Sequence, residues 1–201
     1  MKIAIVAGSH RHESESARVA RYLEATVRKA GADQTYLLSL ADNPLPLWDE
    51  GALGDDPKWK ALWSPIAAEL AGTDGLVVVS PEWSGMVPAG LKNFFLLCGG
   101  ELLAHKPALI VTVSVSLGGS YPVVELRTSS YKNTRVCYLP DHVIVRNAGR
   151  MLKGGQPADE HDAHLRQRID YSLRLLLAYG KALQSVRASG VVDLKSFPYG
   201  M

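Results

Sequence analysis

Residues 2–31 read KIAIVAGSHRHESESARVARYLEATVRKAG. Residues 2–7 of this stretch are almost wholly apolar and end at Gly8, which is typical of a strand buried on both faces of a sheet. A polar loop follows, and helical spacing then runs from about residue 16 to Gly31, a residue suited to ending a helix. The apolar positions at that spacing are Ala17, Ala20, Leu23, Val27 and Ala30. The stretch predicts a strand, a loop and a helix in direct succession.

The same alternation continues along the chain. Further strands are expected at 34–40, 75–80, 107–116 and 143–145, and further helices at 57–71, 88–97, 118–131 and 159–186. Strands that alternate with helices imply right-handed crossovers and a parallel sheet with helices on both faces. Five such units predict an α/β fold with a doubly wound five-stranded sheet of order 2-1-3-4-5. The glycine-containing stretch 146–160 is expected to form a flexible surface loop.

Length and charge narrow the class of protein. The chain has 201 residues, and at roughly 150 residues per domain this predicts a single domain spanning 1–201. The net charge is +2, and no cluster of lysine and arginine offers a footprint for nucleic acid. We therefore expect no nucleic-acid partner.

Two further properties bear on where the protein works. Its two cysteines, Cys98 and Cys137, lie far apart and in no zinc spacing, which suits a reducing compartment. The apolar run at residues 3–8 is too short for a secretory signal, and no stretch nears the roughly 18 apolar residues of a membrane span. We expect a cytoplasmic protein without a membrane partner.

Ligands of such sheets bind beyond the carboxyl ends of the strands, so the loops after the first, third and fourth strands matter most. The first loop, at 8–16, leads directly into a helix, whose free N–H groups, serine hydroxyls and the Arg11 guanidinium would suit a phosphate. It has neither the Gly-Lys-Ser/Thr ending of a nucleotide P-loop nor a G-x-G-x-x-G pattern. The alternative is that Ser14 or Ser16 only caps the helix and Arg11 is exposed.

The second and third loops suit a flat ring. The second, at 81–88, carries an aromatic residue, a glycine and two prolines, which could fix backbone amides against such a ring. The third, at 114–120, offers serine hydroxyls and glycine amides. Each loop alone is equally consistent with an ordinary turn or helix cap, but three of them at one sheet edge predict a binding site.

The sequence of these loops resembles the NAD(P)H-dependent FMN reductases of the flavodoxin-like superfamily, which include quinone, chromate and azo-dye reductases. The family's G-S-x-R-x-x-S-x-N pattern is similar to GSHRHESES at 8–16. Its P-E-Y-N-x-x-x-P-x-x-L-K-N pattern is similar to PEWSGMVPAGLKN at 81–93, and its L-P-x-Y-D pattern to LPLWD at 45–49. The resemblance covers about residues 1–145. This chain departs from the family's asparagine or tyrosine at three positions, Ser16, Ser84 and Trp83.

The resemblance implies an oxidoreductase with a flavodoxin-like fold. It implies that the protein binds FMN, takes a hydride from NAD(P)H and passes electrons to a second acceptor such as a quinone, free flavin or another small oxidant. Because the flavin carries the redox chemistry, no catalytic side chain is expected. The alternative is a flavin-binding carrier or regulatory module without catalytic turnover.

The resemblance also implies positions for the cofactor. The phosphate would lie in the first loop, the ring along the second, where Glu82 is expected to contribute its backbone, and the third loop would flank the ring. The expected cofactor-binding residues are Ser9, Arg11, Ser14, Ser16, Pro81, Glu82, Trp83, Ser84, Gly85, Ser114, Ser116, Gly118 and Gly119.

A homodimer or homotetramer is implied by the same resemblance, with the flavin near the subunit boundary. Trp48 and Asp49 would then approach the flavin pocket of a neighbouring subunit. The alternative is that the Pro-punctuated segment 44–49 tucks under the following helix of its own chain.

Other chemistries find little support in the sequence. No cysteine or carboxylate completes a metal site with the histidine pairs 10/12 or 161/164, so no metal is expected. A serine hydrolase built on Ser84 or Ser116 would lack the G-x-S-x-G turn. Cys98 has no visible activating base and is expected to be a buried structural thiol.

Overall fold

The sheet has the order that the sequence predicts. A computed structural model describes residues 1–200. Its five strands pair in the order β2-β1-β3-β4-β5, and every pair is parallel. The strands are β1 (Lys2–Ala7), β2 (Gln34–Ser39), β3 (Gly75–Pro81), β4 (Pro107–Val113) and β5 (Cys137–Val145).

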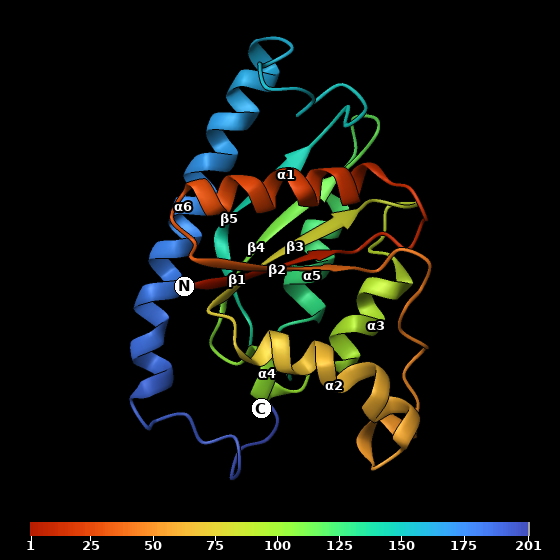
Figure 1. The fold of residues 1–201 in the computed structure, drawn as a ribbon, viewed down its shortest axis with the longest axis vertical. Coiled ribbons are helices and arrows are strands. Elements are labelled where there is room, and N and C mark those ends of the chain that lie inside the picture. Colours follow the sequence, from red (N-terminus) through yellow and green to blue (C-terminus); the bar gives the residue numbers. More distant parts are fainter. Residues whose placement is uncertain (201) are drawn as a thin grey trace.

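Helices cover both faces of the sheet (Figure 1). Helices α1 and α6 pack on one face, while α2, α3 and α5 pack on the other. The helices are α1 (Glu15–Lys29), α2 (Pro57–Ala71), α3 (Ala89–Leu97), α4 (Gly100–Leu103), α5 (Tyr121–Ser129) and α6 (Glu160–Ala188), with a short 3-10 helix η1 (Glu50–Leu53). No helix among residues 1–200 is long and apolar enough to cross a membrane.

Two hydrophobic cores result from the alternation of side chains along the strands. Ile3 and Ile5 of β1 point toward α1 and α6, whereas Ala4 and Val6 point toward α2 and α3. Every residue of β3 and β4 is buried. Because both faces are covered, these strands are continuous apolar runs, which is why the sequence predicts them well.

The fifth strand is longer than the predicted 143–145. It begins at Cys137 and includes the polar or proline positions that hide it from a hydrophobicity pattern. Its register against β4 shifts, since Ala108 pairs with Tyr138 but Ile110 pairs with His142. An edge strand tolerates such a bulge and the proline within it.

The loop at 146–160, expected to be flexible, is instead fastened to two helices. The Arg18 guanidinium of α1 donates hydrogen bonds to the carbonyls of Ala148, Met151 and Leu152 at 2.6–2.9 Å. The buried Asp162 of α6 accepts from the backbone N–H groups of Leu152 and Ala158. These contacts argue against the flexibility expected from the sequence. They are made by Arg18 and Asp162, which lie outside the loop.

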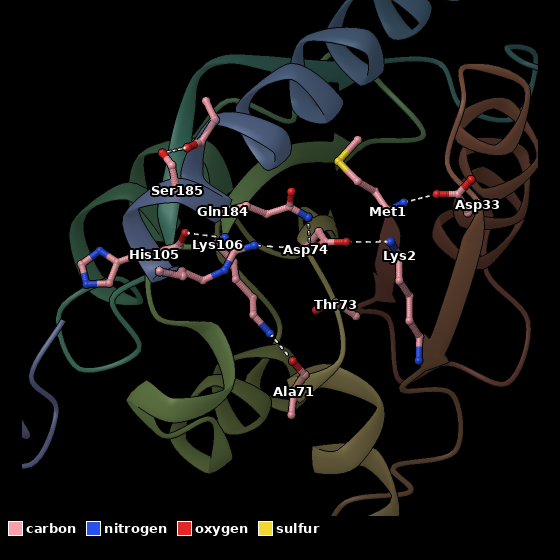
Figure 2. Close-up of polar contacts among 12 residues, drawn as sticks. Met1, Lys2, Asp33, Ala71, Thr73, Asp74, His105, Lys106, Gln184 and Ser185 are labelled. Carbon is pink, nitrogen blue, oxygen red and sulfur yellow. Dashed lines mark hydrogen bonds and ion pairs between the residues drawn. The ribbon is translucent and has the colours of Figure 1, made fainter. Parts of the chain in front are cut away.

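A polar cluster lies at the amino ends of β1 and β3 (Figure 2). The Asp74 carboxylate accepts hydrogen bonds from the backbone N–H of Lys2 at 3.0 Å, from Gln184 at 2.8 Å and from Arg187 at 3.3 Å. The Lys106 ammonium donates to carbonyl oxygens in the last turn of α2, where the helix dipole favours a cation. The cluster ties α2 and α6 to the sheet.

We expect Asp74→Asn to lower the free energy of unfolding by about 1–2 kcal/mol at pH 7, because it weakens charge-assisted hydrogen bonds. Burial alone would raise the pKa of Asp74, but the hydrogen bonds from Gln184 and Lys2 and the charge of Arg187 outweigh it, so the pKa lies below 3.8. A carboxylate with a depressed pKa in the folded state stabilises the fold above its unfolded pKa and loses that effect as the pH falls through its folded pKa. Urea unfolding at pH 7 and pH 3 should show the deficit of the variant shrinking at pH 3; an equal deficit at both would contradict the assignment.

Candidate functional site

A cavity of about 990 Å³ lies beyond the carboxyl ends of β1, β3 and β4, where the winding of the sheet reverses. The three loops singled out from the sequence form its walls. Of the expected cofactor-binding residues, those that line it are Ser9, Arg11, Ser14, Ser16, Pro81, Glu82, Trp83, Ser84, Gly85, Ser114 and Ser116.

The first loop starts where glycine is required. A Cβ on Gly8 would lie 2.6 Å from a methyl of Leu91 and 2.8 Å from the carbonyl oxygen of Val79. Ser14 caps α1, since its hydroxyl accepts a hydrogen bond from the N–H of Ala17 at 3.1 Å. Ser14 therefore has the capping role that the sequence left open. The N-terminus of α1 faces the cavity together with two buried serines, Ser9 and Ser16.

Basic side chains gather at this end of the cavity. Arg11, Arg18 and Arg21 all line it. Arg18 is engaged by Glu15 at 2.6 Å and by the carbonyls of the 146–160 loop, whereas Arg11 and Arg21 are exposed. Sequence reasoning missed Arg18 and Arg21; their three-residue spacing on the helix that follows the first loop was the available signal. The exposed Arg11 can meet an anion at the N-terminus of α1.

The second loop contains a tight two-residue turn. Trp83 and Met86 exchange backbone hydrogen bonds of 3.1 and 2.9 Å, and Ser84 and Gly85 between them have φ angles of 51° and 74°. Positive φ at both central residues defines a type I′ turn, in which asparagine followed by glycine is the favoured pair. The Trp83 ring also meets the His10 ring edge-on at 4.6 Å between centroids, so the first and second loops pack together.

Ser84→Asn should raise the free energy of unfolding by about 0.5–1 kcal/mol, because asparagine adopts positive φ more readily than serine. Ser84→Ala is the matched control, since alanine has no such preference and should give no gain. Guanidinium unfolding of the three proteins measures the difference. An asparagine variant no more stable than the alanine variant would contradict the role of the turn.

Two residues of the second motif act outside the cavity. The buried Asn93 accepts a hydrogen bond from the N–H of Trp48 at 2.7 Å and donates one to the carbonyl of Pro46 at 2.7 Å. Lys92 forms an ion pair of 2.7 Å with Glu125 of α5. Asn93 thus holds the segment at 46–48 and Lys92 joins α3 to α5, and neither residue lines the cavity.

The third loop contributes its serines to the cavity but not its glycines. Gly118 and Gly119 do not line the cavity, because the Glu82 carboxylate lies against them. The N–H of Gly119 donates to that carboxylate at 2.7 Å, and the N–H of Tyr121 donates to the same oxygen at 3.2 Å. The Glu82 side chain is thus bound to the third loop, and a contribution of its backbone to the cofactor stays a prediction. Ser114 and Ser116 form this wall of the cavity.

The segment at 45–49 is buried at one end and exposed in its middle. Leu45 is buried, whereas Leu47 is 74% and Trp48 37% exposed. The Asp49 carboxylate accepts from the Trp59 indole at 2.6 Å and from the N–H of Gly51, so it caps η1 in its own chain. Neither Trp48 nor Asp49 lines the cavity of the same chain.

Sheet order, cavity and loops define a flavodoxin-like α/β protein with a candidate anion site at the start of α1. Residues 1–150 match the family described as NADPH-dependent FMN reductase, and the chain belongs to that family. It is therefore an oxidoreductase that uses FMN, with NAD(P)H as the electron donor, as the resemblance to this family implies.

Relatives in sequence include reductases of quinones. The chain is 32% identical over 131 residues to a quinone reductase of Escherichia coli strain K12, covering 63% of this chain and 68% of the relative. It is 26% identical over 167 residues to a 2-hydroxy-1,4-benzoquinone reductase of a Burkholderia species, covering 80% and 87% of the two chains.

Solved structures share the fold. The flavoenzyme FerB of Paracoccus denitrificans, an NAD(P)H:(acceptor) oxidoreductase, has a TM-score of 0.69 at 17% identity, covering 90% of this chain and 97% of its own. An FMN-dependent NADH-azoreductase of Bacillus anthracis, solved in complex with FMN, has a TM-score of 0.59 at 13% identity, covering 88% and 99%.

Proposed function

We propose that the protein reduces a quinone or a similar small oxidant with electrons from NAD(P)H, and that the 990 Å³ cavity is its FMN site. When bound, FMN supplies the redox chemistry by accepting a hydride and passing electrons to the acceptor. The observation that carries this proposal is the convergence of the three family-like loops on one cavity. The quinone reductases among its relatives support the class of acceptor.

The first loop would hold the FMN phosphate. The buried hydroxyls of Ser9 and Ser16 and the N–H groups at the start of α1 supply donors, and the exposed Arg11 supplies a charge. The close approach of the chain at Gly8 and the cap at Ser14 keep these donors in place. These residues fit a phosphate monoester.

The second and third loops would hold the ring from two sides. The turn at 83–86, which presents Trp83, Ser84 and Gly85, forms one wall with Pro81 and Glu82. Ser114 and Ser116 form the other, and a hydrogen bond of 3.2 Å from the Ser116 N–H to the Ser114 hydroxyl orients it. The protein's part would be to bind and orient the ring.

A homodimer or homotetramer is part of the proposal. Large apolar side chains are exposed at Met86 in the second loop, at Tyr121 at the start of α5 and at Leu47 in the segment 45–49, and exposed apolar patches mark protein contacts. The segment at 45–49 would bring Trp48 and Asp49 toward the flavin pocket of a neighbouring subunit. We further propose that the whole chain is one FMN-binding domain and that it works in the cytoplasm, where its two free cysteines would stay reduced.

Steady-state assays of the FMN-loaded protein with NADH or NADPH test the proposal when benzoquinone, free FMN or an azo dye is the acceptor. We expect turnover with at least the quinone, at a rate well above that of free FMN. Bound FMN with no turnover on any acceptor would favour the flavin-binding carrier or regulatory module instead.

A further inference from the structure

Glu82 lies between two walls of the cavity. It precedes the turn at 83–86 in the second loop, yet its carboxylate reaches the third loop and the start of α5. One oxygen, Oε2, accepts from the N–H of Gly119 at 2.7 Å and from the N–H of Tyr121 at 3.2 Å. The contact spans 37 residues of sequence, so it joins loops that the chain itself does not connect.

Helix α5 depends on this carboxylate for its N-terminal cap. Ser120, at the cap position, forms no side-chain capping hydrogen bond. Its hydroxyl instead accepts from Arg146 at 3.3 Å. The first N–H groups of a helix need acceptors, and a negative charge there is favoured by the helix dipole. Glu82 supplies both from the neighbouring loop.

A second carboxylate, on α5, accepts a hydrogen bond from the second loop. Glu125 of α5 accepts a hydrogen bond from the N–H of Val87, at the end of the second loop, at 2.7 Å, and pairs with Lys92 of α3. Burial alone would raise the pKa of Glu125, but the Lys92 and Val87 hydrogen bonds and the Lys92 charge lower it on balance. The second loop is thereby fixed to α5 at both of its ends.

The third loop is shaped around the Glu82 side chain. A Cβ on Gly118 would lie 2.6 Å from Glu82 Oε1, a distance that no side chain tolerates without displacement. Gly119 has a φ of 111°, a conformation that presents its N–H to the carboxylate and that other residues rarely adopt. Gly118 therefore leaves room for the Glu82 carboxylate, and Gly119 donates a hydrogen bond to it, whereas a Cβ on Gly119 would lie 2.5 Å from Ile144.

We propose that Glu82 is a positioning residue that couples the turn at 83–86 to the loop at 114–120, so that one carboxylate sets the spacing of the two walls that would hold the flavin ring. This inference rests on the proposed FMN site. Without the carboxylate, the Gly119 and Tyr121 N–H groups lose their acceptor and the third loop is free to move away from the second. The phosphate end of the cavity should keep its geometry.

Two variants of Glu82 distinguish the effect of its hydrogen bonds to Gly119 and Tyr121 from the effect of its negative charge. Glu82→Ala removes the acceptor, and we expect FMN affinity to fall about tenfold and amide exchange at Gly119 and Tyr121, measured without FMN, to accelerate. Glu82→Gln retains one oxygen, which suffices because both N–H groups donate to the same atom. It should restore slow exchange and FMN affinity to within about threefold of the parent protein.

Gly118→Ala perturbs the same contact from the other side. Its methyl group would push the carboxylate away, so it should also weaken FMN binding, and the double variant with Glu82→Ala should be no weaker than Glu82→Ala alone. Gly118→Ala also serves as the second test if Glu82→Ala does not fold. Arg11→Ala is the matched control, since it should weaken FMN binding without changing exchange at Gly119.

Unchanged exchange in Glu82→Ala, no rescue by glutamine, or additive effects in the double variant would each overturn the role of Glu82. Exchange is measured on the protein without FMN, so it reports on the coupling of the loops independently of the cofactor. A parent protein that fails to bind FMN would instead refute the proposed function.

Discussion

Arg11→Ala should weaken FMN binding about ten- to a hundredfold while leaving the fold intact. A charge-assisted hydrogen bond to a phosphate contributes about 1.5–3 kcal/mol, which corresponds to that loss of affinity. Arg11 is exposed in the loop that ends at the N-terminus of α1, so its removal should cost no folded-state contact of this size. Quenching of FMN fluorescence during titration measures the dissociation constant.

Arg21→Ala is the matched control for Arg11. Arg21 is also exposed and lines the cavity, but it lies in the second turn of α1, beyond the N–H groups that would face a phosphate. We expect its replacement to change FMN affinity less than threefold. Unchanged affinity in a folded Arg11→Ala protein would show that the phosphate binds elsewhere.

The double variant Leu47→Ser, Trp48→Ala should dissociate the proposed oligomer and weaken FMN binding by about tenfold or more at the same time. Both side chains are exposed in the chain alone, and Asn93 holds the backbone of Trp48 in place, so the segment presents a fixed apolar surface. The few hot-spot residues of an interface, among which tryptophan is enriched, contribute about 2 kcal/mol or more to association. If the segment completes a neighbouring pocket, one change affects both properties.

Sedimentation and flavin titration on the same sample test this prediction. Val191→Ser is a suitable control, because Val191 is 76% exposed in the C-terminal segment after α6, far in sequence from the three loops. It should leave both properties unchanged. An intact oligomer with normal FMN affinity in the double variant, or a monomeric parent protein, would contradict the prediction. The segment at 45–49 would then pack only within its own chain.

The sheet could be predicted because its central strands are buried on both faces. β1, β3 and β4 are apolar at nearly every position, and five alternating strand–helix units match the doubly wound order 2-1-3-4-5. The sequence predicts β5 only at 143–145, because Pro140, Asp141 and His142 interrupt its apolar pattern. Helix α4 and η1, each of four residues, are too short to show a periodicity.

The loops of the site could be predicted, but the contacts that shape them could not. The cavity-lining serines, Arg11 and the turn at 83–86 lie in short contiguous motifs. Glu82 with Gly119, and Arg18 with Leu152, are pairs separated by 37 and 134 residues. A local pattern contains no information about such partners. The sequence therefore could not show that the glycines of the third loop lie against the Glu82 carboxylate and do not line the cavity.

Anaerobic stopped-flow mixing of the FMN-loaded protein with NADH, and separately with NADPH, tests whether the protein is an NAD(P)H-dependent flavin oxidoreductase. We expect the visible absorbance of the bound flavin to bleach in one turnover with at least one of the two nucleotides, faster than for free FMN. A second mix with benzoquinone should restore the oxidised spectrum. Flavin that stays bound and oxidised with both nucleotides would contradict this function.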